Sequence, residues 1–546
     1  MAHSQLTQHA LEIWQAGVEA VTPARLFRDK VRLEGTCLVV EHVELELSGV
    51  RRLVVVGAGK AAAAMAVALQ QEVLSQLKAA LPGLELQGWI NAPADAFTAA
   101  DAQALQPIHV HAARPASVNS PTEAAIEGTQ RIVELLKNCD ARDRVICLLS
   151  GGGSALLVAP APGVTLADKQ AVAQQIAAAG GNIEQLNAVR RPLSLVKGGG
   201  LARACRAARM LTLIISDVLG DPLEAIASGP TILQPTLPRE KHHPRSRSRQ
   251  TLDPRSRSHQ TLDPRSRSHQ TLDPRSRSRQ TLDEPNDAHR LATSATDISP
   301  TDADTRTNAA RALAVLRELG LTNSPVLAGA AQALQQQQSQ PQSLPDQAPP
   351  VQSTARCVVD NIILGNNADA VDAAGVKAVE LGYRYVMQSA RGVEGDVRQV
   401  AQHAADAIVQ LVGQQQIDCW ISGGEPTVKL PESAGQGGRN QQLTLAVMRE
   451  FQLRKLQASQ TQGDVDALPE IVFLSGGTDG EDGPTDGAGA FFDDGVIARA
   501  ADLGLKADDY LARADAYSFF KQAGGLLQTG ATGTNVCDLR VALCKH

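Results

Sequence analysis

A chain of 546 residues is too long for one hydrophobic core and should divide into two or three domains. Apolar residues make up 43% of the chain, an ordinary proportion for a globular protein. Aromatic residues make up only 3% and the formal net charge is −6, so the chain lacks the aromatic side chains and the basic surface of a protein that stacks and binds nucleic acid. The eight Cys form no C-x-x-C pair, so we expect neither a disulfide framework nor a zinc site. We find no targeting segment and no apolar run of about 18 residues, so we expect a soluble cytoplasmic enzyme without a membrane anchor.

The first part of the chain alternates apolar runs with helical patterns. An amphipathic helix is predicted up to about Ala20, and RRLVVVGAGK at 51–60 then predicts a strand and a tight turn before an Ala-rich helix. The same order recurs, with strands predicted at 86–93, 144–150 and 210–217 and helices at 121–138 and 168–180. This alternation predicts a Rossmann-like, doubly wound α/β fold with a parallel sheet.

Residues 244–283 are four tandem copies of a ten-residue unit, PRSRS(R/H)QTLD. One Leu is the only apolar residue of each copy, so the repeats cannot build a core and are predicted to be disordered. Their ten Arg and four Asp give a net charge of +6 and leave −12 for the rest of the chain. An RNA-associated protein is suggested by this Arg-Ser pattern alone, which explains none of the glycine loops described below.

Beyond this insert the α/β pattern returns. A helix at 308–320 precedes a Gln-rich stretch, 332–352, that is predicted to be a linker. Strands are predicted at 357–365, 418–422 and 470–475, helices at 368–382, 396–412 and 439–451, and a loop with a last strand at 530–543. The pattern predicts two α/β domains separated by polar linkers.

Four predicted strands run directly into glycines, at VVVGAGK (54–60), LLSGGGS (148–154), WISGGEP (420–426) and FLSGGTDGEDG (473–483). Glycine lacks Cβ and accepts positive φ, so successive backbone N–H groups can converge on an anion. In a parallel sheet such loops lie at the carboxyl edge, where α/β enzymes bind ligands. Three copies of Ser-Gly-Gly favour phosphate binding over tight turns alone. The residues assigned to the nucleotide are Gly57, Gly59, Ser150, Gly151, Gly152, Gly153, Ser154, Ser422, Gly423 and Gly424.

The first loop also fits a loose dinucleotide fingerprint, G-x-G-x-x-A, over residues 57–62. An NAD(P)H-dependent oxidoreductase is therefore the main alternative. That fingerprint needs an acidic residue about 20 positions on, at the end of the next strand, to bind the ribose. The next strand presents Asn91 instead, and Lys60 brings a cation that would stabilise phosphate charge. Both features favour phosphoryl transfer.

Phosphoryl transfer needs cations around the migrating group, a divalent metal with carboxylate ligands, and a base for the acceptor hydroxyl. Asp217 ends the predicted strand 210–217 and is the first choice for the base, although a helix cap would also explain it. The candidate cations are Lys60, Arg190, Lys197 and Arg439. The candidate metal ligands lie among the acids Asp479, Glu481, Asp482 and Asp486, of which Asp479 and Asp482 are assigned to Mg²⁺.

Together, these segments resemble the glycerate 2-kinase family (type II glycerate kinases), whose C-terminal part is the MOFRL domain. The matching stretches are VVVGAGKAA, LLSGGGSALL, LNAVRRPLSLVKGGGLA, LIISDVLGDPLEAIASGPT, ISGGEPTV, GRNQQLTLA, LSGGTDGEDGPTDGAGA and TGTNV. They extend over nearly the whole chain, outside residues 236–300 and the Gln-rich stretch.

The resemblance implies two domains with the active site between them. The N-terminal, Rossmann-like domain is placed at 1–340 with residues 236–300 as an insert, and the smaller C-terminal α/β domain at 352–546 with the MOFRL region at about 417–541. The resemblance also implies ATP, Mg²⁺ and conversion of D-glycerate to 2-phosphoglycerate. Lys60 and Arg439 match the family's catalytic lysine and arginine. The residues assigned to the substrate are Arg190, Lys197 and Glu425.

Two positions depart from the family pattern. VRRPLS at 189–194 stands where many bacterial relatives read V-R-K-H-L-S, so Pro192 cannot supply an imidazole contact, and Ala113-Arg114-Pro115 stands where G-H-P is frequent. Members of the family have also been called hydroxypyruvate reductases, which keeps that NAD(P)H-dependent activity as the alternative. A homodimer is a further expectation, and no nucleic-acid partner is expected.

Overall fold

The structure is a computed structural model that describes residues 4–115, 120–233, 302–339, 357–390, 392, 394–413, 417–462 and 470–545. The repeat segment 244–283, with its predicted disorder, lies outside these ranges. The described residues belong to one unit of tertiary contacts, which contains two six-stranded sheets and a three-stranded one.

The first six-stranded sheet is parallel throughout and has the strand order β6-β5-β4-β7-β8-β9. Its strands are β4 (Arg52–Ala58), β5 (Glu85–Pro93), β6 (Ile108–Arg114), β7 (Asp143–Ser150), β8 (Arg209–Ile215) and β9 (Val358–Gly365). The strand order reverses between β4 and β7, and ligands of doubly wound sheets bind at the carboxyl ends of the strands beside such a reversal. The predicted Rossmann-like, doubly wound fold is confirmed.

Both faces of this sheet are covered, which explains why its strands read as continuous apolar runs. In β4, Leu53 and Val55 pack into one layer while Val54 and Val56 pack into the other. The first layer contains α2 (Pro23–Lys30), α3 (Ala62–Leu69) and the antiparallel strands β1 (Val31–Glu34), β2 (Cys37–Val40) and β3 (Val43–Glu46). The second layer contains α6 (Glu123–Lys137), α7 (Gly153–Leu156) and α10 (Gly200–Ala204).

Four helices form a separate apolar core next to this sheet: α8 (Leu166–Ala178), α9 (Ile183–Arg190), α11 (Asp302–Glu318) and α12 (Ala328–Ser339). The sequence predicts a linker from residue 332, but α12 continues to Ser339. The helix persists because Ala333 and Leu334 are buried against its neighbours and Gln is a good helix former.

The second six-stranded sheet is mixed, with the order β10-β11-β15-β12-β13-β14. Its strands are β10 (Tyr385–Gln388), β11 (Cys419–Gly424), β12 (Ile471–Gly477), β13 (Gly489–Phe492), β14 (Leu526–Leu527) and β15 (Asp538–Cys544). Strands β11 and β12 flank β15 and both run antiparallel to it, so Gly424 and Gly477 are opposite the same residue, Asp538. The carboxyl ends of β11 and β12 therefore lie at the edge where β15 begins.

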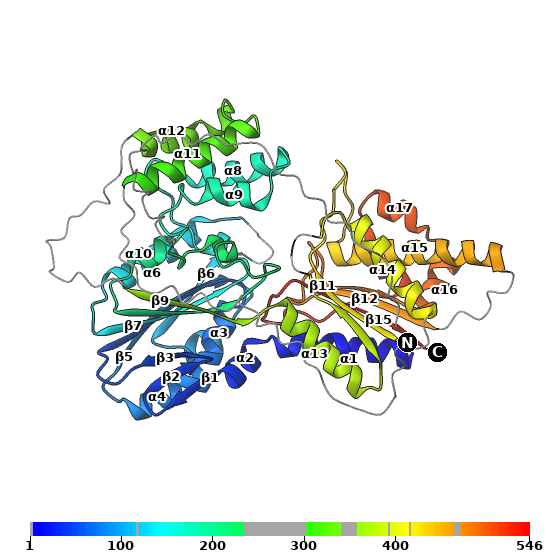
Figure 1. The fold of residues 1–546 in the computed structure, drawn as a ribbon, viewed down its shortest axis with the longest axis horizontal. Coiled ribbons are helices and arrows are strands. Elements are labelled where there is room, and N and C mark those ends of the chain that lie inside the picture. Colours follow the sequence, from blue (N-terminus) through cyan, green and yellow to red (C-terminus); the bar gives the residue numbers. More distant parts are fainter. Residues whose placement is uncertain are drawn as a thin grey trace, which may run out of the picture. The chain divides into compact units, whose positions relative to one another are not determined.

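Helices cover both faces of the second sheet. Helices α1 (Gln5–Ala20) and α13 (Asn367–Glu380) lie on one face, and α14 (Val397–Gly413) and α15 (Arg439–Gln462) lie on the other (Figure 1). The predicted amphipathic helix at the start of the chain is confirmed as α1, whose Ile13 and Trp14 are buried in this core. Helices α16 (Asp494–Asp502), α17 (Ala507–Ala512) and α18 (Ala516–Ala523) also contact this layer.

The predicted boundary at residues 340–352 does not separate these two cores. Strand β9 lies beyond the boundary but pairs with β8 in the first sheet. Helix α1 lies before it but packs against the second sheet, because its apolar stripe is buried there. None of the helices in the described part of the chain combines the length and apolar character that a membrane crossing needs.

Candidate active site

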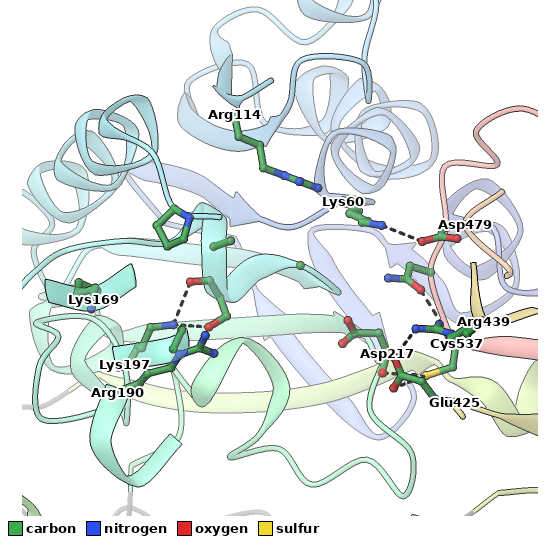
Figure 2. A pocket seen from close by; sticks show the side chains of 16 residues that line it. Lys60, Arg114, Lys169, Arg190, Lys197, Asp217, Glu425, Arg439, Asp479 and Cys537 are labelled. Atoms are coloured by element: carbon green, nitrogen blue, oxygen red, sulfur yellow. Dashed lines mark hydrogen bonds and ion pairs between the residues drawn. The ribbon is translucent and has the colours of Figure 1, made fainter. Parts of the chain in front are cut away.

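A pocket of about 330 Å³ opens at the carboxyl edge of the first sheet. Six basic and three acidic side chains contribute to its wall (Figure 2). The lining residues are Lys60, Arg114, Pro121, Gly152, Ser154, Ala155, Lys169, Ala173, Arg190, Lys197, Asp217, Glu425, Arg439, Asp479, Asn535 and Cys537. Segments more than 400 residues apart in the sequence therefore meet here, as the ion pair of Lys60 with Asp479 shows.

Two of the glycine loops are joined beside this pocket. The backbone N–H of Lys60 donates to the carbonyl of Gly151 (2.8 Å), and the N–H of Ala61 donates to Ser150 Oγ (2.9 Å). Gly59 has a φ of +148°, and a Cβ on it would overlap Ser150. Glycine is thus required for the close approach that presents Lys60 to the pocket.

Lys60 forms ion pairs with two acids of the GGTDGEDG loop. Its Nζ donates to Asp479 Oδ2 (2.9 Å) and to Glu481 Oε2 (2.8 Å), and its side chain is 19% exposed. Burial opposes the charged form, but Asp479 and Glu481 outweigh it and hold the pKa of Lys60 above its ordinary value. The lysine is therefore a fixed cation at neutral pH.

Asp217 follows β8 and points into the same pocket (Figure 2). Burial raises its pKa, while a hydrogen bond from the Gly152 N–H and the nearby Lys60 charge oppose that rise. A Cβ on Gly151 would overlap the Asp217 carboxylate, so glycine there leaves room for it. Cys537, with a φ of 69°, donates its thiol to the Asp217 carbonyl (2.8 Å). A carboxyl group with a raised pKa in a cleft is suited to accept a proton.

Arg439 is the first residue of α15 and is held by two carboxylates. Its Nε and Nη2 donate to the two oxygens of Asp538 (2.8 and 2.9 Å), and its Nη1 donates to Glu425 Oε1 (2.8 Å). Burial opposes the charge on Arg439, but Asp538 and then Glu425 raise its pKa. Burial raises the pKa of Glu425, and Arg439 opposes this. The guanidinium group of Arg439 is thereby fixed in the wall of the pocket.

Asp482, which the sequence assigns to Mg²⁺, lies outside the pocket. Its carboxylate accepts the backbone N–H groups of Asn440 (2.9 Å) and Gln441 (2.8 Å) at the start of α15, and the residue is 2% exposed. Asn440 Nδ2 also donates to Asp538 (2.9 Å). Asp482 does not line the pocket; it caps the helix that begins with Arg439.

Lys169, Arg190 and Lys197 form a cluster of cations on the side of the pocket away from Arg439 (Figure 2). In the described part of the chain none of the three makes an ion pair with an acid. Burial lowers the pKa of Arg190, and burial with the Arg190 charge lowers the pKa of Lys169 to about 8. Burial, then Lys169 and Arg190, lower the pKa of Lys197 well below its ordinary value. We call these three residues the cation cluster.

Oxygen atoms hold Lys197 in place. Its Nζ donates to the carbonyl of Ser154 (3.1 Å), to Ser154 Oγ (2.6 Å) and to Ser228 Oγ (3.4 Å). Ser228 and its neighbour Ala227 have φ values of 65° and 50°, which are costly for residues with a side chain. No residue of the ASGPT segment lines the pocket, so Ser228 acts on the site through its hydrogen bond with Lys197.

Only two of the residues assigned to the nucleotide line the pocket. Gly152 and Ser154 line the pocket, and Gly59, Ser150 and Gly151 support it as described above. Gly57 and Gly153 are buried beside β7 and β4, where a side chain would meet the neighbouring backbone.

The Ser-Gly-Gly motif of β11 lies outside the pocket. Ser422, Gly423 and Gly424 pair with β15 in the sheet, and a Cβ on either glycine would overlap Asn367 or Glu394. Their backbone groups are used by the sheet, so here the motif serves packing.

The assigned substrate residues Arg190, Lys197 and Glu425 all line the pocket, as does Asp479 of the metal pair. Among the described residues, no group of three or more His, Cys, Asp or Glu side chains is arranged to hold a metal ion.

The sequence assigned no role to seven lining residues, of which four have a polar, charged or thiol side chain: Arg114, Lys169, Asn535 and Cys537. Asn535 lies within TGTNV and Arg114 within a segment that departs from the family pattern, so local signals existed for both. Lys169 sits in an ordinary helical pattern, and no sequence signal marks it.

Comparisons with known proteins agree with this arrangement. Residues 9–251 match the family described as a domain of unknown function, DUF4147, and residues 418–538 match the MOFRL family. The chain is 31% identical to a glycerate kinase of Danio rerio, over 99% of this chain and 98% of that protein. It is 31% identical to an Agrobacterium vitis protein with a hydroxypyruvate reductase name, over 90% of this chain and 99% of that protein.

A solved structure shares the fold. The crystal structure of a Thermotoga maritima glycerate kinase is 25% identical and matches with a TM-score of 0.65 over 100% of both chains. The near-complete coverage means that the matches include the residues of both sheets and of the segments around the pocket. The chain belongs to the glycerate kinase family with a MOFRL region.

Proposed function

We propose that this protein is an ATP-dependent kinase that converts D-glycerate to 2-phosphoglycerate with Mg²⁺. The observation that carries the proposal is the convergence of Lys60, Arg439, Asp217 and the cation cluster on one pocket of about 330 Å³. A small hydroxy acid offers a carboxylate and a hydroxyl, and phosphoryl transfer needs a base and fixed cations, so each group has a partner.

The acceptor's carboxylate is assigned to the cation cluster. The sequence assigns Arg190 and Lys197 to the substrate, and Lys169 adds a third positive group without an acidic partner among the described residues. A buried cation without a counter-ion is unfavourable in the free protein, and an anionic ligand relieves that cost.

Asp217 is assigned as the base. Its carboxylate takes the proton of the acceptor hydroxyl as that oxygen bonds to the γ-phosphorus of ATP, and the bond from this phosphorus to the β–γ bridging oxygen breaks to release ADP. Lys60 and Arg439 stabilise the charge that develops on the transferred group, since preorganised cations act most strongly there.

The residues around the pocket fit Mg²⁺. This ion takes oxygen ligands and is usually held by only one or two carboxylates together with substrate phosphates and water. Asp479 and Glu425 line the pocket and offer such oxygens. Mg²⁺ would neutralise phosphate charge next to Lys60.

The NAD(P)H-dependent alternative is less well supported. Asn91, where the dinucleotide fingerprint requires an acid, is fully buried, and its Nδ2 donates to the carbonyl of Leu156 (2.8 Å). It is therefore committed to the core. The relatives with a hydroxypyruvate reductase name belong to the same family as those named glycerate kinase.

The test is a pair of assays on the full chain. The first supplies ATP, Mg²⁺ and D-glycerate and couples the product directly to enolase, which uses 2-phosphoglycerate but requires a mutase for 3-phosphoglycerate. The second supplies NADH and hydroxypyruvate. We expect ADP formation with a signal that does not need the mutase, and no NADH oxidation. Reductase activity without kinase activity would overturn the proposal.

A further inference from the structure

A second cavity of about 370 Å³ lies on the other side of α3 from the core of the first sheet. Small and apolar side chains dominate its wall, with Ala64 and Val67 from α3, Ala24 from α2, and Phe97 from the turn after β5. Thr22 and Thr532 add hydroxyl groups, and Gln71 and Asp101 add an amide and a carboxyl group. The mechanism above does not use this cavity.

Helix α3 explains why the cavity is apolar. Its sequence, AAAMAVAL, has no polar side chain in eight residues. The inner face is buried in the core through Met65 and Leu69, whereas Ala64 and Val67 on the outer face remain partly exposed. A helix that is apolar on all sides is normally covered on all sides. The outer face of α3 is covered only in part, by α2 and by the loop at Gly533, and the cavity lies over the remainder.

The second cavity shares a wall with the active site. Thr532 lines the second cavity and Asn535, three residues later in the same loop, lines the first. The N–H of Thr532 donates to the carbonyl of Asp479 (3.3 Å), and Asp479 pairs with Lys60. Helix α3 begins two residues after Lys60 and continues into the second cavity. The two cavities are therefore neighbours, separated by this loop and by the start of α3.

We propose that this second cavity binds the adenine ring of ATP while the phosphates extend to Lys60. The proposal rests on the kinase function proposed above. A purine has apolar faces and a polar edge, which suit a wall of Ala64, Val67 and Phe97 with hydroxyl groups from Thr22 and Thr532 at the rim. The cavity lies beside the carboxyl ends of β4 and β5, within the edge where doubly wound sheets bind nucleotides.

A second protein chain fits the cavity less well than a small molecule. Its volume, about 370 Å³, is within the range of small-ligand pockets. A stable protein interface buries about 800 Å² on each partner, so a second chain would have to contact surface outside this cavity as well.

The test fills the cavity from two independent walls. Leucine at Ala64 or at Ala24 adds three carbons to a small space, and we expect either A64L or A24L to raise KM for ATP by at least about 10-fold. KM for D-glycerate and kcat should stay unchanged. The matched control is Ala79→Leu, at an exposed alanine of α4 (Ser75–Ala80) that lines neither cavity. Thermal melting of all three variants confirms that they fold.

A probe without adenosine separates the ring from the phosphates. Inorganic tripolyphosphate should inhibit A64L and the wild-type enzyme equally, whereas ADP should inhibit A64L much less. Unchanged KM for ATP in both A64L and A24L, with an active wild-type kinase, would overturn this inference alone. Loss of a dimer in A64L with unchanged KM would also overturn it, since the cavity would then be a protein contact. A wild-type enzyme without kinase activity would refute the proposed function itself.

Discussion

Replacing Lys169 by methionine should stabilise the protein and weaken substrate binding at the same time. Lys169 is 8% exposed, has no acidic partner among the described residues and lies in the first turn of α8, where the helix dipole disfavours a cation. Burial lowers its pKa from 10.5 to about 8. That difference corresponds to a cost of about 3 kcal/mol for the charged form in the folded state.

Methionine keeps the length of the side chain and removes the charge. The hydrogen bond from Lys169 Nζ to the Leu193 carbonyl (3.1 Å) is lost, but that carbonyl also accepts the N–H of Ala161 (3.2 Å) and is not left without a donor. The loss should cost about 1 kcal/mol. We therefore expect K169M to be more stable than the wild type by about 1–2 kcal/mol at neutral pH.

The stability difference between K169M and the wild type should depend on pH. Because the pKa of Lys169 is lower in the folded state, the unfolded chain binds more protons between pH 8 and 10.5, and wild-type stability rises with pH across that window. The advantage of K169M should thus be present at about pH 7 and shrink by about pH 10. Thermal melting at both pH values measures it, and Lys78→Met, at an exposed lysine of α4, is the control.

Substrate binding should move in the opposite direction. A charge-assisted hydrogen bond contributes about 1.5–3 kcal/mol, so KM for D-glycerate should rise about 10-fold or more in K169M while KM for ATP stays unchanged. A K169M protein that melts below the wild type at neutral pH, or one with unchanged KM for D-glycerate, would show that Lys169 is a structural residue and refute the reasoning.

Three further predictions concern the reacting groups. Lys60→Ala should lower kcat by about 10²–10³-fold without unfolding the protein, because a cation that stabilises transition-state charge is lost. A folded variant with normal kcat would show that Lys60 serves only to pair with Asp479. Arg439→Lys should lower kcat by about 10-fold or more, because lysine cannot reproduce the two-pronged contact with Asp538, and an unaffected kcat would mean that the fork is not needed. The kcat/KM of the wild type should fall as pH drops through the raised pKa of Asp217, because the base must be ionised, and a profile in Asp217→Asn that keeps this limb would assign it to another group.

Much of the fold and part of the site could be predicted from the sequence, because the signals are local. Apolar runs that end in glycine identify β4, β7, β11 and β12, and alternation with helical patterns gives the doubly wound sheet. Lys60 and Arg439 could be selected because each follows glycine at a helix start. Asp217 could be selected because it ends an apolar strand.

Only the tertiary structure decided which of these residues share the pocket. The Ser-Gly-Gly motif at Ser422 has the same local pattern as the one at Ser150, yet β15 pairs with its backbone and removes it from the site. Asp482 and Asp479 are three positions apart, but one caps α15 and the other reaches Lys60. Lys169 faces the pocket because α8 packs with that side inward, and side-chain direction of this kind depends on contacts between elements that no local pattern encodes.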